Sequence, residues 1–229
     1  MIFDIDGVLV DSYAVHFQSW QMAAGRFGFV ISERQFADTF GQTSRSIIRQ
    51  LCGQEVGDGE VQEIDAYKEA AYRQIIAADF PTMPGAVELI DALAADGFAL
   101  AVGSSGPPEN VQLALDQLDR HALFDAQVSG ADVTRGKPDP QVFQVAAQRL
   151  GIPPAACAVI EDAAAGVAAA RAAGMLSVAL VSTGHHIAEY DQADQIVQRL
   201  DQLSPAGLRQ WITARRGDPR GVRESFAGE

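Results

Sequence analysis

The amino-acid sequence predicts an α/β fold, in which a parallel β-sheet carries helices on both faces and receives one helical insertion near its start. Short apolar segments alternate with segments of helical periodicity along most of the chain. The alternation is interrupted once, by residues 13–82, which have helical periodicity and no convincing strand. Acidic side chains directly follow two of the short apolar segments, which points to chemistry at the ends of strands.

Six short apolar segments are the predicted strands, because each is too short for a helix and is bounded by turn or polar residues. They are Ile2–Ile5, Ala99–Gly103, Ala126–Ser129, Ala158–Ile160, Ser177–Val181 and Gln195–Val197. Between them, apolar residues recur at the spacing of amphipathic helices, as in residues 86–93, 111–118 and 143–150. Asp139 and Pro140 predict the N-cap and the first residue of the last of these helices. Strands that alternate with helices in this way form a parallel sheet covered on both faces.

Residues 13–82 are predicted to form a helical domain inserted into the α/β core. Apolar residues at helical spacing predict three helices there, around residues 17–27, 47–51 and 61–78. The segment Phe80–Gly85 contains two prolines and a glycine, which predicts the return to the core. We therefore expect a core of residues 1–12 and 83–229 and an insertion of residues 13–82.

The composition limits the classes of partner and the location. The chain has 229 residues and a formal net charge of −13, so we expect it to bind neither nucleic acid nor an anionic membrane. No protein partner is evident. Asp4 and Asp6 interrupt the apolar N-terminus, so no signal peptide is expected, and the two cysteines do not suggest a disulfide framework. These features predict a cytoplasmic protein.

Two carboxylates end the first predicted strand. Asp4 and Asp6 lie two residues apart, so both point to one side if the chain is still extended, and Gly7 then permits a sharp turn. Like charges this close are unfavourable unless they share a cation or a proton. One such carboxylate can attack phosphorus and bind a metal while the other transfers a proton. The alternative interpretation is an acidic pair that only caps a turn.

Four short motifs follow one another in an order that resembles the haloacid dehalogenase (HAD) superfamily. Asp4–Gly7 resembles the first signature of that superfamily, and Ser104, at the end of a predicted strand, resembles the second. Lys137, within a Gly-Lys-Pro-Asp-Pro segment, resembles the third, and Glu161–Asp162 resembles the fourth. The resemblance covers residues 1–181, and four motifs in order are far more specific than any one of them.

This resemblance implies a fold and a chemistry. The implied fold is a Rossmann-like parallel-sheet core with an inserted helical cap domain of the C1 type. Asp4 would be the nucleophile that forms an aspartyl-phosphate, and Asp6 would be the general acid and base. The implied cofactor is Mg²⁺, which prefers oxygen ligands. Its ligands would be Asp4, the backbone carbonyl of Asp6, Asp162, and Glu161 directly or through water.

The resemblance also implies residues that bind the substrate. Ser104 would donate a hydrogen bond to a phosphate oxygen, although it could also cap the following helix. Lys137 would neutralise phosphate charge, and the turn that begins at Ser105 leads into a helix whose N-terminus favours anions. His16 and Trp20 are four residues apart on the first insertion helix, where packing and substrate contact are both open interpretations.

The predicted function is that of a Mg²⁺-dependent phosphatase acting on a small phosphorylated metabolite such as a sugar phosphate. Asp6 argues against the dehalogenases of the superfamily, which lack an acid at that position. A phosphonate hydrolase would bring a lysine from the cap, and Lys68 is the only lysine of the insertion. An inactive binding scaffold would have lost signature residues, and none is lost. His185 and His186 are adjacent in a loop and are expected to be exposed.

A sugar-phosphate mutase is the main alternative. The spacing of four residues resembles that of β-phosphoglucomutase; these are Asp11, Ser12, His16 and Trp20. The mutase pattern has an arginine directly after Gly-x-Ser/Thr at the start of the second cap helix, and here Arg45, a candidate anion contact, comes one place later. The mutase pattern also includes a cap lysine, which has no counterpart near Arg73. These departures favour the phosphatase.

Overall fold

A six-stranded parallel β-sheet forms the centre of the protein. The computed structural model describes residues 1–40 and 42–217. The strands are β1 (Ile2–Phe3), β2 (Ala101–Gly103), β3 (Ala126–Val128), β4 (Ala158–Glu161), β5 (Leu176–Leu180) and β6 (Gln195–Val197). The six predicted strands are therefore confirmed. β1 ends before the predicted end at Ile5, because the carbonyl of Ile5 accepts hydrogen bonds from the amides of Val8 and Val10 in a tight turn.

The strand order places the predicted functional residues at one edge of the sheet. The order is β3-β2-β1-β4-β5-β6, and it reverses beside β1, which pairs with β2 on one side and β4 on the other. In sheets of this kind, ligand sites lie at the carboxyl ends of the strands next to the reversal. Asp4 follows β1, Ser104 follows β2, and Glu161 ends β4. Their side chains therefore start from three adjacent strand ends.

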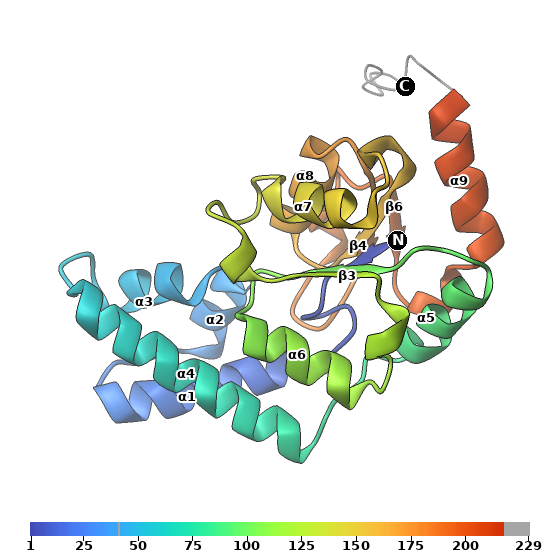
Figure 1. Cartoon of the computed structure of the whole chain (residues 1–229). Helices are drawn as coiled ribbons and strands as arrows, with labels where there is room; N and C mark the ends of the chain where they lie inside the picture. The colour runs from blue at the N-terminus through green and yellow to red at the C-terminus, as the bar shows by residue number, and fades with distance from the viewer. Residues whose placement is uncertain (41, 218–229) are drawn as a thin grey trace.

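Helices cover both faces of the sheet, as predicted (Figure 1). They are α5 (Ala86–Ala95), α6 (Pro108–Gln117), α7 (Gln141–Leu150), α8 (Ala164–Ala172) and α9 (Pro205–Gly217). Because successive side chains of a strand point to opposite faces, Phe3 joins a hydrophobic cluster with residues of α5, α6 and α9, whereas Ile2 joins a cluster with residues of α7 and α8. The result is a three-layered α/β core.

The start of α7 differs by one residue from the prediction. Pro140 is the N-cap residue rather than the first helical residue, and the side-chain oxygen Oδ1 of Asp139 accepts a hydrogen bond from the amide of Gln141 at 3.0 Å. Short 3-10 helices complete the core: η1 (His121–Leu123), η2 (Gly130–Asp132), η3 (Pro154–Ala156), η4 (Ile187–Glu189) and η5 (Leu200–Gln202).

The insertion is helical, as predicted, and lies beside the carboxyl edge of the sheet (Figure 1). Its helices are α1 (Tyr13–Phe27), α2 (Glu33–Thr39), α3 (Ser44–Cys52) and α4 (Asp58–Ala78). The prediction missed α2. A local signal for it exists, because Ser32 and Gln35 form a capping box at its start.

The insertion has a hydrophobic cluster of its own, which includes Trp20, Ile48 and Ile64. Tyr72 and Ile76, near the end of α4, instead belong to the cluster that packs against the sheet. The insertion is therefore anchored on the core through the second half of α4. The division into a core of residues 1–12 and 83–229 and an insertion of residues 13–82 stays a prediction.

The two connections between core and insertion lie side by side. The amide of Asp11 donates a hydrogen bond to the carbonyl of Pro81 at 2.8 Å. The amide of Met83 donates to the carbonyl of Leu9 at 3.0 Å. The insertion thus leaves and rejoins the core through two short paired segments, which is the arrangement of a hinge.

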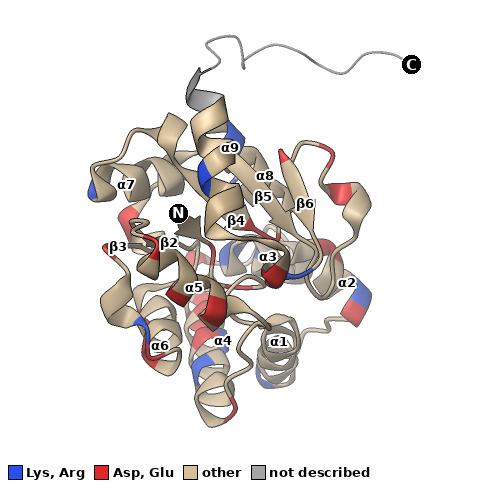
Figure 2. Cartoon of the chain, turned by 90° about the vertical axis from the view of Figure 1, so that its right-hand side faces the viewer, with Lys and Arg blue, Asp and Glu red and all other residues tan. Residues whose placement is uncertain are grey.

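Acidic residues occur on elements of both the core and the insertion, in keeping with the net charge of −13 (Figure 2). Within residues 1–40 and 42–217, no helix is both long enough and apolar enough to cross a membrane.

The separate cluster of the insertion leads to a prediction about local stability. Ile48 is fully buried, so Ile48→Ala is expected to destabilise the insertion by about 2–5 kcal/mol. Val30 is 80% exposed, so the control Val30→Ala is expected to change stability by no more than about 0.5 kcal/mol. Hydrogen exchange of Ile48→Ala should accelerate at the amides of α1, α3 and α4 before those of the sheet. Equal acceleration in both domains would contradict a separate cluster.

Candidate active site

A cavity of about 490 Å³ lies between the insertion and the carboxyl edge of the sheet. All ten residues that the sequence predicted for the site line this cavity: Asp4, Asp6, His16, Trp20, Arg45, Ser104, Ser105, Lys137, Glu161 and Asp162. They come from the strand ends of the core, from the loop before α7 that carries Lys137, and from α1 and α3 of the insertion. The fold therefore brings together residues up to 158 positions apart in the chain.

A buried lysine holds two carboxylates of the cavity floor. The ammonium of Lys137 donates to Asp4 Oδ1 at 2.8 Å and to Glu161 Oε1 at 2.5 Å. Burial alone would lower the pKa of Lys137, but the charges of Asp4 and Glu161 outweigh that effect and raise it. Lys137 is therefore a permanent cation at the centre of the site.

Three carboxylates around this lysine form a possible metal site. Oxygen atoms of Asp4, Glu161 and Asp162 lie within 4.8 Å of one another, and all three residues are buried. Three carboxylates and one ammonium leave two uncompensated negative charges. Burial raises the pKa of Asp4 to about 7, and burial with the charges of Glu161 and Asp4 raises the pKa of Asp162 well above its ordinary value. A divalent cation with oxygen ligands fits this cluster, because it would supply the missing charge.

Two glycines leave room for these carboxylates. A Cβ atom at Gly7 would lie 1.6 Å from Asp162 Oδ2, and Gly7 has a φ of 71° that side chains rarely adopt. A Cβ atom at Gly166 would lie 1.8 Å from Glu161 Oε1. Glu161 Oε2 also accepts a hydrogen bond from the amide of Ala163 at 2.7 Å. The carboxylates are thus fixed by close backbone contacts at the start of α8.

Asp6 has different surroundings from Asp4. Asp6 Oδ1 accepts hydrogen bonds from Tyr72 Oη at 3.0 Å and from His16 Nε2 at 2.9 Å. The ammonium of Lys68 lies 3.0 Å from His16 Nδ1 and has only hydrogens to donate, so Nε2 carries the hydrogen that points to Asp6. Burial raises the pKa of Asp6, but its contact with His16 and the charge of Lys68 outweigh that effect and hold this pKa below its ordinary value.

Lys68 corrects one expectation from the sequence. The prediction found no cap lysine near Arg73, but Lys68 lies one helical turn before Tyr72 on α4 and is only 3% exposed. Its ammonium lies 5.6 Å from the ring centroid of Trp20 and 5.5 Å from that of Tyr72. The insertion therefore does bring a buried lysine to the site, through its contact with His16.

Ser104 and Ser105 lie in the turn between β2 and α6. Ser104 is 3% exposed, and its hydroxyl accepts a hydrogen bond from the amide of Gly106 at 3.0 Å. It does not cap α6, whose N-cap residue is Pro107. Both serines line the cavity, and neither is the N-cap residue of the helix.

Trp20 and Arg45 line the cavity from the insertion. Trp20 is 1% exposed and belongs to the insertion's hydrophobic cluster, so packing accounts for most of its surface. The Arg45 side chain is 64% exposed, and its Nε lies 3.4 Å from Asp65 Oδ2. Gly41, part of the motif before Arg45, lies outside the described residues.

His185 also departs from the prediction. Its side chain is 6% exposed rather than open to solvent, whereas His186 is exposed as expected. His185 Nδ1 lies 2.8 Å from Glu189 Oε2, and Nε2 lies 3.8 Å from Asp162 Oδ2. The ring packs against Phe40 of the insertion, with centroids 5.5 Å apart, which explains its burial.

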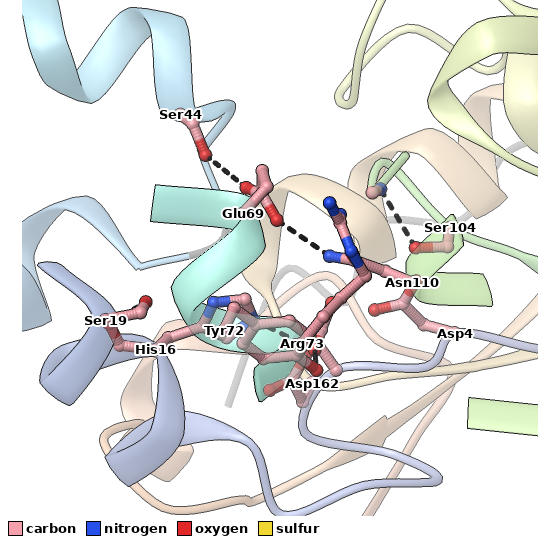
Figure 3. A network of polar contacts seen from close by, with 12 residues as sticks. Asp4, His16, Ser19, Ser44, Glu69, Tyr72, Arg73, Ser104, Asn110 and Asp162 are labelled. Atoms are coloured by element: carbon pink, nitrogen blue, oxygen red, sulfur yellow. Dashed lines mark hydrogen bonds and ion pairs between the residues drawn. The ribbon is translucent and has the colours of Figure 1, made fainter. Parts of the chain in front are cut away.

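Sequence reasoning missed a polar network across the mouth of the cavity (Figure 3). Glu69 of α4 accepts hydrogen bonds from Ser44 of α3 and from Asn110 of α6. Asn110 also accepts one from Arg73 of α4. Glu69 and Arg73 are four residues apart on α4 and so share one face of the helix, which was the signal available in the sequence.

The fold and the site together define a class of enzyme, a Rossmann-like α/β protein with a carboxylate cluster under a helical cap. The chain matches the family described as haloacid dehalogenase-like hydrolase over residues 1–174. It is 31% identical over 205 residues to validoxylamine A 7'-phosphate phosphatase from Streptomyces hygroscopicus subsp. limoneus, covering 88% of this chain and 94% of that protein. This chain belongs to the haloacid dehalogenase-like hydrolases.

Two further similarities agree with this assignment. The chain is 33% identical over 186 residues to the β-phosphoglucomutase of Bacillus subtilis (strain 168), covering 78% of this chain and 81% of that protein. The crystal structure of a β-phosphoglucomutase from Clostridium difficile superimposes with a TM-score of 0.84 over 95% of this chain and 98% of that chain. Its sequence identity is 21%, so this second likeness supports the fold.

The tight contact at Gly166 predicts the effect of a single methyl group. Gly166→Ala is expected to displace the Glu161 carboxylate and to weaken divalent-cation binding by about 10- to 100-fold, because supporting contacts of metal ligands have effects of that size. Cation affinity would be measured by calorimetry. Gly25→Ala is the control, because no atom lies within 4 Å of the added methyl group on exposed α1. Unchanged affinity in Gly166→Ala would contradict the placement of Glu161.

The raised pKa of Asp4 predicts a pH-dependent stability. A carboxyl whose pKa is about 7 in the folded protein and 3.8 otherwise stabilises the metal-free fold below pH 3.8 and loses that contribution as the pH rises to about 7. As the pH rises from 3.8 to about 7, the wild type should therefore lose up to about 4 kcal/mol of unfolding free energy relative to Asp4→Asn. Denaturant unfolding with a chelator would measure it. A difference that is constant with pH would refute the raised pKa.

Proposed function

We propose that this chain is a Mg²⁺-dependent phosphatase that hydrolyses a small phosphorylated metabolite through an aspartyl-phosphate on Asp4. The observation that carries the proposal is that two aspartates lining one cavity have opposite electrostatic surroundings. Asp4 lies in the carboxylate cluster beside Lys137, whereas Asp6 is held by His16 and Tyr72. Carboxylates with contrasting surroundings are suited to different roles in one reaction.

The proposed reaction has two steps on these two aspartates. In the first, the Asp4 carboxylate attacks phosphorus, the bond from phosphorus to the leaving oxygen breaks, and Asp6 gives its proton to that oxygen. In the second, Asp6 takes a proton from a water molecule that attacks the same phosphorus. The bond from phosphorus to Asp4 then breaks, which releases inorganic phosphate and restores the Asp4 carboxylate.

The surroundings of Asp6 favour its role in the second step. Both hydrogen bonds from His16 and Tyr72 go to Oδ1, which leaves Oδ2 to carry the transferred proton. The same two hydrogen bonds stabilise the carboxylate form, which must activate water in the second step. His16 thus acts on Asp6 rather than on the substrate in this proposal.

The remaining residues would neutralise and hold the phosphate. Mg²⁺, held by Asp4, Asp162, Glu161 and the backbone carbonyl of Asp6, would supply the charge that lets an anion approach these carboxylates. Lys137, already placed at Asp4, would neutralise charge that persists through the transfer. The Ser104 hydroxyl would donate a hydrogen bond to a phosphate oxygen beside the start of α6.

A sugar phosphate is the proposed substrate class. The cavity volume suits a small molecule, and its insertion side carries polar side chains that can bind hydroxyl groups, including Thr43, Ser44 and Asp65. The similarity to validoxylamine A 7'-phosphate phosphatase supports a phosphate ester as the substrate. We also propose a cytoplasmic enzyme whose only partner in this reaction is the small-molecule substrate.

A sugar-phosphate mutase is the second candidate, and one observation favours it. Lys68 is a buried lysine of the cap that contacts His16, and the chain resembles a β-phosphoglucomutase. Against it, Arg45 is paired with Asp65 and the Lys68 ammonium is paired with Glu69. No positive charge in the described cap residues lining the cavity is then left over for a second phosphate group, so hydrolysis is preferred.

The test is a panel of phosphate esters incubated with the protein and Mg²⁺, with release of inorganic phosphate as the readout. Asp4→Asn should lower the rate by roughly 10³-fold or more, and Asp6→Asn by about 10²- to 10⁴-fold. Asp38→Asn on exposed α2 is the matched control and should keep the wild-type rate. Substantial activity in Asp4→Asn would refute covalent catalysis by that residue.

The same panel separates the two candidates. β-Glucose 1-phosphate with a bisphosphate primer would be followed for glucose 6-phosphate. Isomerisation without release of phosphate would establish the mutase and replace the proposed phosphatase.

A further inference from the structure

We propose that Glu69 and Asn110 are positioning residues, which join the insertion to the core and thereby hold Asp6 in its reactive orientation. This inference rests on the proposed function for its kinetic consequence. The structural part, a bridge between α4 and α6, stands on its own. It concerns residues that contact neither Asp4 nor the carboxylate cluster in the structure.

Asn110 forms the core side of the bridge. It is 7% exposed and lies in the first turn of α6, directly after the turn that contains Ser104. Its Nδ2 donates to Glu69 Oε2 at 2.7 Å, and its Oδ1 accepts from Arg73 Nη1 at 3.0 Å. Both ends of the amide are therefore engaged by the insertion, which fixes its orientation.

Glu69 forms the insertion side. Its other oxygen, Oε1, accepts hydrogen bonds from Lys68 Nζ and from Ser44 Oγ, each at 2.8 Å. Burial raises the pKa of Glu69, but the charge of Lys68 outweighs it and holds that pKa below its ordinary value. An ionised Glu69 thus compensates the buried ammonium of Lys68. Removing it would leave that cation without its carboxylate.

Two adjacent faces of α4 connect the bridge to Asp6. One face carries Lys68 and Tyr72, which are four residues apart. Tyr72 contacts Asp6 directly, and Lys68 contacts it through His16. Glu69 and Arg73, each one position later, face Asn110. Figure 3 shows Glu69 and Arg73 of α4 beside Asn110. Since α4 is a continuous helix, this contact fixes how the helix is rotated and positioned against the core, and so where Lys68 and Tyr72 lie.

The consequence is a link between cap closure and proton transfer. The contacts of Asp6 with His16 and Tyr72 cross from core to insertion, so they exist only when the insertion lies against the core. The bridge crosses the same boundary beside the phosphate-binding turn. The bridge therefore stabilises the closed arrangement, in which Asp6 Oδ1 is hydrogen-bonded to His16 and Tyr72.

The test exchanges the two partners of the hydrogen bond. Asn110→Asp keeps the size of the side chain but places a second carboxylate against Glu69, which breaks the bridge. Adding Glu69→Gln restores the hydrogen bond with its direction reversed, because the side chain at position 69 now donates and the one at position 110 accepts. It also restores the original net charge. Gln112→Glu, at an exposed position of the same helix, is the control for added negative charge.

The readout compares an alkyl phosphate ester with p-nitrophenyl phosphate, whose leaving group needs no proton. Asn110→Asp should lower kcat/KM, which reports the first step alone, by about tenfold or more for the alkyl ester, while kcat/KM for p-nitrophenyl phosphate changes by less than about threefold. The double variant should recover part of the loss, because its new amide still accepts from Lys68 and Ser44 but lacks the charge that compensates the Lys68 ammonium. Gln112→Glu should behave like the wild type. Equal loss with both substrates, or a double variant no better than the single one, would overturn the proposal.

Hydrogen exchange separates this failure from a failure of the proposed function. In Asn110→Asp, amides of α4 and of the first turn of α6 should exchange faster than in the wild type, while those of the sheet stay unchanged. This result would support the bridge even if the wild type released no phosphate, which would count against the phosphatase alone. Unchanged exchange in α4 and α6 would overturn the bridge whatever the activity.

Discussion

The ion pairs of Lys137 with Asp4 and Glu161 are the interaction on which the rest of the site depends. Three carboxylates meet at the ends of β1 and β4, and one buried ammonium compensates only one of them. Such a cluster is costly without further positive charge. The sheet topology creates it, two glycines leave room for it, and the raised pKa values of Asp4 and Asp162 express its cost. A bound divalent cation is the natural means of relieving it, and its charge would also let an anionic substrate approach.

The insertion adds a second electrostatic environment only two residues away. Asp6 is drawn out of the carboxylate cluster by His16 and Tyr72, and its pKa moves in the opposite direction from that of Asp4. A single strand end thereby presents two aspartates with separate chemistry. The division depends on the cap, because both partners of Asp6 belong to α1 and α4. Cap and core are therefore parts of one active site.

The sequence predicted the core well, because its signals are local. The lengths of apolar segments and the helical periodicity predicted the strands and helices. The four motifs predicted site residues, and all of these line one cavity. The prediction failed where contacts join distant segments. Nothing near Lys68 in the sequence reveals that it meets His16, 52 positions earlier, and nothing near Asn110 reveals Glu69. His185 was expected to be exposed. It is buried because its ring packs against Phe40 of the insertion, a contact that the neighbouring sequence does not reveal. The helix α2 was missed although its capping box was readable.

The raised pKa values of Asp4 and Asp162 mean that the carboxylate cluster holds protons near neutral pH, which a divalent cation would displace. Calorimetric titration of the protein with Mg²⁺ at pH 7, in two buffers of different ionisation enthalpy, measures this directly. Mg²⁺ binding is expected to release protons to the buffer. The measured binding enthalpy should therefore differ between the buffers in proportion to their ionisation enthalpies. Binding without proton release, or no binding at all, would contradict it.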